Sequence, residues 1–123
     1  MKTILTKALR AKLIDNGQAQ RAAILNGGDD PQPIDPYPVV KLFTPDANAT
    51  WLLTEVDPDD QDLAFGLMDL GLGEPELGYV RISELQALRG PLRLAVERDL
   101  HFEASRPISV YFQEARRAGR IVT

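Results

Sequence analysis

Four short apolar segments that alternate with turn-forming residues constrain this chain more than any other feature. They cover residues 39–43, 49–56, 63–70 and 78–82, and prolines, glycines and aspartates stand between them. Apolar runs of this length bounded by such residues are typical of strands. Connections this short favour antiparallel neighbours. The sequence therefore predicts an antiparallel β meander of about four to five strands.

The third segment indicates how this sheet is covered. Leu63 to Met68 is apolar on both faces, whereas a strand with one solvated face would alternate with polar residues. Trp51, in the second segment, is expected to pack in the core. Helices are the expected cover. Ser83 and Gln86 form a capping-box pattern, which predicts a short helix that begins at Ser83. A final helix that starts near Pro107 is expected to pack on the sheet. The last helix carries one apolar stripe, formed by Ile108, Tyr111, Phe112, Ala115 and Ala118. The predicted fold class is α+β.

An N-terminal helical arm is predicted ahead of this domain. Thr3 is placed to cap a helix with the stripe Leu5, Leu9 and Leu13, and Asn16-Gly17 is read as its end, followed by a second short helix over residues 18–25. Four of the nine prolines then fall within residues 29–38. The predicted organisation is an arm over 1–28, a proline-rich linker over 29–38 and one α+β domain over 39–123. Such an arm needs packing to persist, either on its own domain or on a second copy, as in a homodimer.

Composition excludes several classes of site. The chain has 123 residues and no cysteine, so disulfides and cysteine-ligated metal centres are excluded. Its first residues lack the apolar region of a signal peptide, and no apolar run approaches the ~20 residues that span a bilayer. We expect a cytoplasmic protein without a membrane partner or cofactor.

Charge is distributed unevenly along the chain. Residues 1–28 hold five basic and one acidic side chain, residues 29–80 hold one and twelve, and residues 81–123 hold eight and five. No nucleic-acid-binding motif accompanies the arginines, so direct DNA binding is not expected. The acidic block indicates a binding surface for another protein, with these candidate residues: Asp57, Asp59, Asp60, Glu74 and Glu76.

One segment is a weak candidate for catalysis. If residues 97–103 were extended, their period of two would place Glu97, Asp99, His101 and Glu103 on one face. A carboxylate beside an imidazole can run acid–base chemistry, and His101 is the only histidine. A solvated strand face with a structural Asp99–His101 pair explains the same pattern. A strand face also spaces these side chains too widely for all four to ligate one ion, so no metal site is predicted.

The acidic loops match no binding motif. Asp57, Asp59, Asp60 and Asp62 lack the glycine and distal glutamate of a calcium loop. The segment 71–76 has glycines like a phosphate loop, but it has no lysine and carries two glutamates.

Residues 38–121 resemble an uncharacterised family of small proteins carried on conjugative plasmids and integrated mobile elements of Gram-negative bacteria. The resemblance rests on these pieces: residues 38–45, 50–55, 65–67, 69–80 and 97–102. It implies a genomic setting, often beside antirestriction and plasmid-maintenance genes, and it supplies no catalytic residue. A counter-defence or establishment role in the recipient cell follows as an expectation, with a host or element-encoded protein as the partner.

Two functions remain open from the sequence. The first is a non-enzymatic binding protein of a mobile element that acts through protein–protein contacts of its acidic face. The second is a small hydrolase or metal-dependent enzyme that uses His101 with nearby carboxylates. A concave pocket that gathers His101 and carboxylates would favour the enzyme, whereas an open acidic surface would favour the binding protein.

Overall fold

A five-stranded antiparallel sheet forms the centre of the molecule, in a computed structural model that describes residues 3–123. The strands are β1 (Val40–Phe43), β2 (Thr50–Asp57), β3 (Asp60–Asp69), β4 (Glu76–Arg81) and β5 (Glu97–Arg98). Their order across the sheet is β4-β3-β2-β1-β5, so β4 and β5 are the edges. The predicted α+β meander is confirmed, and β1 to β4 start and end close to the predicted positions.

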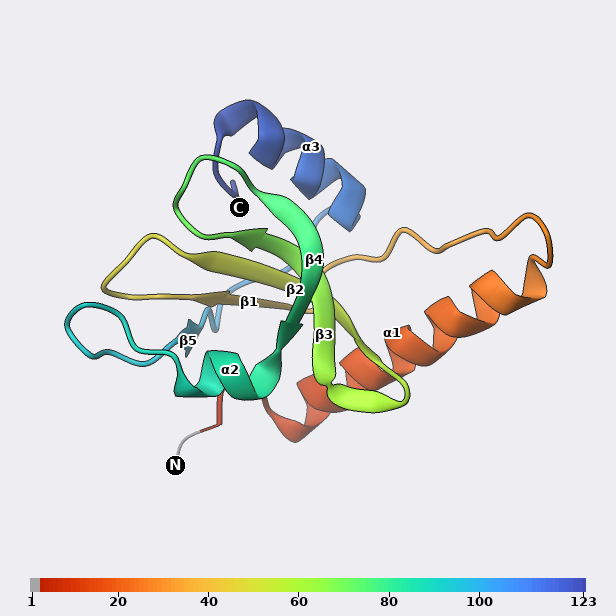
Figure 1. Ribbon diagram of the computed structural model, residues 1–123, viewed down its shortest axis with the longest axis horizontal. Helices are drawn as coiled ribbons and strands as arrows, with labels where there is room; N and C mark the ends of the chain where they lie inside the picture. The colour runs from red at the N-terminus through yellow and green to blue at the C-terminus, as the bar shows by residue number, and fades with distance from the viewer. Residues whose placement is uncertain (1–2) are drawn as a thin grey trace.

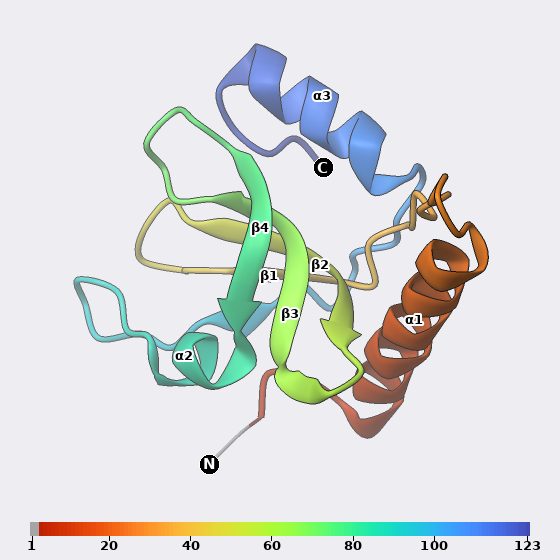
Figure 2. The ribbon, with the colours of Figure 1, turned by 45° about the vertical axis from the view of Figure 1, so that its right-hand side comes forward.

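Helices cover both faces of the sheet, as the doubly apolar third segment predicts (Figure 1). The helices are α1 (Lys7–Asn26), α2 (Ile82–Ala87) and α3 (Ile108–Ala118). One core cluster lies on one face of the sheet and includes the buried Trp51. There the sheet packs against α2, the first half of α1 and the residues that precede α1. A second cluster joins α3 to Leu52 and Leu67 on the other face. Figure 2 shows α3 separated from α2 by the strands.

The N-terminal arm docks on its own sheet as one continuous helix. Leu5 and Leu13 of the predicted stripe are buried in the first core cluster, and Leu9 packs against it. The predicted helix end at Asn16-Gly17 is wrong, because both residues serve close packing instead. Gly17 lies against the Val56 carbonyl oxygen, only 1.9 Å from where a Cβ would stand.

Neighbouring contacts fix α1 beside the second half of β2. Of β2, only Thr50–Leu53 pair with β1, so the rest of β2 has no strand on that side, and α1 lies there instead. The Asn16 side chain donates a hydrogen bond to the Thr54 carbonyl oxygen at 2.9 Å. At the start of the helix, Thr6 rather than Thr3 caps α1 by accepting from the Leu9 amide.

The capping-box prediction for α2 is also wrong. Ser83 is inside the helix, and its amide and hydroxyl both donate to the Asp62 carboxylate on β3, at 2.8 and 2.7 Å. A carboxylate from a neighbouring strand therefore replaces the local cap. α3 agrees with prediction: Ile108, Tyr111 and Ala115 are buried, and Gly119 ends it in the left-handed conformation.

Candidate functional site

The acidic turn between β2 and β3 is matched by arginines from elsewhere in the chain. Arg21 of α1 donates two hydrogen bonds to Asp59, at 2.8 and 3.1 Å, and lies 3.7 Å from Asp57. The hydrogen bond from Arg21 is the main cause that lowers the pKa of Asp59. Arg81 lies 3.0 Å from Asp60. Three of the predicted binding residues therefore already have cationic partners within the molecule.

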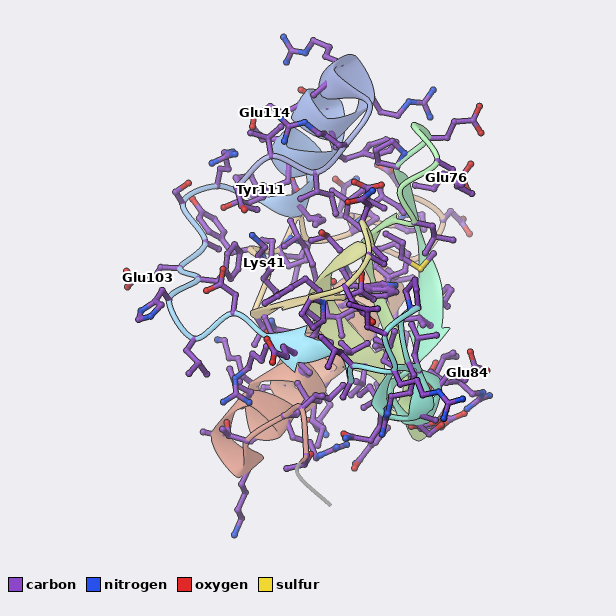
Figure 3. All side chains as sticks on the ribbon, turned by 90° about the vertical axis from the view of Figure 1, so that its left-hand side faces the viewer. Lys41, Glu76, Glu84, Glu103, Tyr111 and Glu114 are labelled. Atoms are coloured by element: carbon purple, nitrogen blue, oxygen red, sulfur yellow. The ribbon has the colours of Figure 1, made fainter. Side chains whose placement is uncertain are left out.

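Glu74 and Glu76 lie far from that turn. They follow the end of β3, whereas Asp57, Asp59 and Asp60 lie at its beginning, and a ten-residue strand separates the two groups by about 30 Å. Both glutamates are exposed, and neither forms an ion pair within residues 3–123. Figure 3 shows Glu76 and Glu84 on the side of β4, away from Glu103. Unpaired negative charge therefore flanks β4.

The hairpin formed by β3 and β4 exposes large apolar side chains. Within residues 3–123, β4 pairs with β3 and with no other strand, so its outer edge is open. Leu77 and Tyr79 point to the same face of the sheet and are 37% and 63% exposed. Leu70 and Leu72 in the connecting loop are 59% and 80% exposed. We call these four residues, with Glu74 and Glu76, the β3–β4 hairpin surface.

The predicted one-sided face of residues 97–103 does not form. Only Glu97–Arg98 is a strand, and the chain turns at Leu100 and His101. The turn is closed by Asp99, whose carboxylate accepts from the His101 amide at 2.9 Å and lies 3.6 Å from the Lys41 ammonium. In the described part of the chain, Asp99 bonds with the His101 backbone amide and pairs with Lys41, and no ion pair or hydrogen bond joins it to the imidazole.

His101 itself lies in the open. Its side chain is exposed, and it does not line the hollow that borders Asp99, Leu100 and Phe102. Within residues 3–123, no three histidine, aspartate or glutamate side chains come close enough to share a metal ion. The described part of the chain also contains no helix that is long and apolar enough to cross a membrane.

One hollow is a structural junction whose lining charges balance one another. It has a volume of about 670 Å³ and lies between the β1–β2 turn, the β3–β4 loop and the C-terminal tail. Lys41 and Arg120 line it together with Asp69 and Asp99. Asp69 is buried and accepts from the amides of Gly71 and Ile121, at 2.9 and 3.0 Å, so it ties the tail to the sheet.

A second hollow, of about 280 Å³, contains a carboxylate that the sequence did not single out. Glu55 on β2 lines it with Phe65 on β3 and Tyr79 on β4, and Ile24 and Leu25 of α1 close the opposite side. Burial raises the pKa of Glu55, against the opposing effect of hydrogen bonds with Thr54 and Gln20. We call this the Glu55 hollow.

A β-bulge aims Glu55 into this hollow. The register between β2 and β3 shifts at Thr54, which leaves Glu55 opposite Phe65, and Phe65 is opposite Tyr79. Without the shift, Glu55 would point to the face of Leu53, in the core. Bulges re-aim side chains in this way. Nothing in the sequence around Glu55 indicates a bulge. The position of Glu55 in this hollow could therefore not be predicted from the sequence.

Comparison with known families identifies the chain. A family described as "Protein of unknown function (DUF2958)" matches residues 4–122. This protein belongs to that family. The match includes α1 and residues 29–38 together with the sheet. No curated protein and no solved structure gives a match.

Proposed function

We propose that this DUF2958 protein is a non-enzymatic binding protein that serves a mobile genetic element through contacts with another protein, and that the β3–β4 hairpin surface is where the partner binds. The observation that carries the proposal is the open edge of β4, with Leu77 and Tyr79 exposed beside it. An unprotected edge strand with apolar side chains pairs readily with an extended segment of another chain.

Charge indicates the kind of partner. Glu74 and Glu76 at the start of β4 have no cation to neutralise them within residues 3–123, unlike Asp57 and Asp59 at the far turn. An extended segment with apolar and basic side chains complements this surface. The resemblance to mobile-element proteins supports a partner in the recipient cell, where counter-defence or establishment of the element would be the purpose.

The test is affinity capture from a recipient cell with a matched pair of variants. Leu77→Ser with Tyr79→Ser removes the apolar side chains of the β4 edge. Leu100→Ser is the control, because Leu100 is 74% exposed and lies after β5, at the other edge of the sheet. We expect a protein that both wild type and the control capture to disappear with the double variant. Equal capture by all three proteins would contradict the proposal.

A further inference from the structure

We infer that the Glu55 hollow is a subsite for one arginine side chain of the partner protein, with the Glu55 carboxylate as its acceptor and the Phe65 and Tyr79 rings against its stem and guanidinium. This inference rests on the proposed function, because Tyr79 belongs both to the hollow and to the β3–β4 hairpin surface. A segment that pairs with the edge of β4 therefore passes the mouth of the hollow.

Geometry supports a single long side chain as the occupant. Glu55, Phe65 and Tyr79 stand side by side on three neighbouring strands and form a row that ends at the open edge of the sheet. The two rings meet edge to face, with their centroids 5.1 Å apart. A hollow of about 280 Å³ falls just below the ~300–1,000 Å³ of typical small-molecule sites. It suits a side chain that enters from the edge.

The charge of the hollow favours a cation. Arg21 also lines it, but its guanidinium is held by two hydrogen bonds to Asp59 and by the neighbouring Asp57. Glu55 has no ion pair within residues 3–123, and its side-chain hydrogen bonds are with neutral groups, the Thr54 hydroxyl at 3.2 Å and the Gln20 side chain. An incoming cation would give this half-buried carboxylate the partner that it lacks.

Arginine suits this environment better than lysine. The guanidinium is more weakly hydrated than an ammonium group, stacks on aromatic rings and can donate two hydrogen bonds to one carboxylate. Phe65 and Tyr79 provide the rings, and Ile24 and Leu25 provide an apolar wall for the stem. Lysine would lose more hydration on entering and would gain a single point contact.

NMR titration with small amides tests the subsite without knowledge of the partner. The probes are N-acetyl-argininamide, N-acetyl-lysinamide and N-acetyl-glutaminamide, each added to the ¹⁵N-labelled full chain. We expect saturable shifts at Glu55, Phe65 and Tyr79 with the arginine probe, and binding at least several-fold weaker with the other two. Equal shifts with the neutral glutamine probe, or none with the arginine probe, would overturn the inference.

Two variants separate the subsite from a structural effect. Glu55→Gln keeps the shape and removes the charge, so the arginine probe should bind about tenfold more weakly, as expected for loss of a charge-assisted hydrogen bond. Leu100→Ser should bind the probe as wild type does. A thermal melt that shows that Glu55→Gln is folded excludes unfolding as the cause of its weaker binding of the arginine probe. Unchanged binding by Glu55→Gln would also overturn the inference.

The two proposals can fail separately. If the β4 double variant loses the captured protein while Glu55→Gln retains it and the arginine probe does not bind, the hairpin surface stands and the arginine subsite is wrong. If the arginine probe binds the hollow but the β4 double variant captures the same proteins as wild type, the site exists and the proposed function is wrong.

Discussion

Replacing Gly17 by alanine tests the close contact between α1 and the sheet. A Cβ on residue 17 would stand 1.9 Å from the Val56 carbonyl oxygen and 3.1 Å from its carbon, and Cβ contacts under 3.0 Å essentially do not occur. Both obstacles are backbone atoms of β2, which cannot rotate away. To restore even 3.0 Å, the helix and the strand must separate by about 1.1 Å.

The energetic terms of this change oppose one another. Alanine improves helix propensity by about 1 kcal/mol over glycine. Forcing the helix and the strand apart costs about 1–3 kcal/mol of stability. The separation would also break the Asn16 hydrogen bond to the Thr54 carbonyl oxygen, which costs about 1 kcal/mol more. The net expectation is that Gly17→Ala is destabilised by about 1–3 kcal/mol. For a chain of this size, that lowers Tm by about 4–12 °C.

Thermal unfolding followed by circular dichroism measures this effect. Gln18→Ala is the matched control, because residue 18 is exposed on the same turn of α1 and should change stability by no more than about 0.5 kcal/mol. A Gly17→Ala protein as stable as wild type, or more stable, would refute the reasoning, since propensity alone would then decide the outcome and α1 could not lie this close to β2.

Three further predictions concern ionisable groups. Burial raises the pKa of Glu55, so ionising Glu55 in the folded protein costs stability as the pH rises above the ordinary glutamate range. Glu55→Gln should therefore have a higher Tm than wild type at pH 7. This difference in Tm should disappear near pH 4. The Ser83 hydroxyl is the main cause that lowers the pKa of Asp62. Ser83→Ala should therefore raise that pKa in a ¹³C NMR titration, and its loss of stability at pH 7 should vanish in acid; an unchanged pKa would contradict this. His101 is exposed, so His101→Ala should keep stability within about 0.5 kcal/mol, and elemental analysis of the wild type should find no stoichiometric metal; a tightly bound metal lost in the variant would favour the enzyme instead.

The sheet could be predicted from the sequence because its signals are local. Strand-length apolar runs and short turns specify a meander, and the run from Leu63 to Met68 specifies cover on both faces. The end of α3 was equally clear, since Gly119 follows the last apolar position and adopts φ 75°.

The errors arise where one residue type serves two purposes. Asn16-Gly17 has the composition of a helix end, yet the same small and polar residues allow α1 to pack against β2. Ser83 has the spacing of a cap, but it bonds with Asp62, which is 21 residues away. Tertiary contacts override local preference in both cases.

The candidate site could be predicted only in part. Glu74 and Glu76 were identified from their charge, but the pairing of Asp59 with Arg21 joins residues 38 positions apart and could not be read from the sequence. Nor could the open edge of β4, which depends on strand order. Glu55 reaches its hollow only because of the bulge at Thr54.

Site-specific photo-crosslinking at residue 79 tests the central claim most directly. A photoreactive phenylalanine analogue replaces Tyr79 in one protein and Leu100 in another, and both are irradiated in recipient cells. The account predicts one discrete crosslinked product with a second protein from position 79 and none from position 100, because only the first lies on the β3–β4 hairpin surface. No product at position 79, or the same product from both positions, would contradict it.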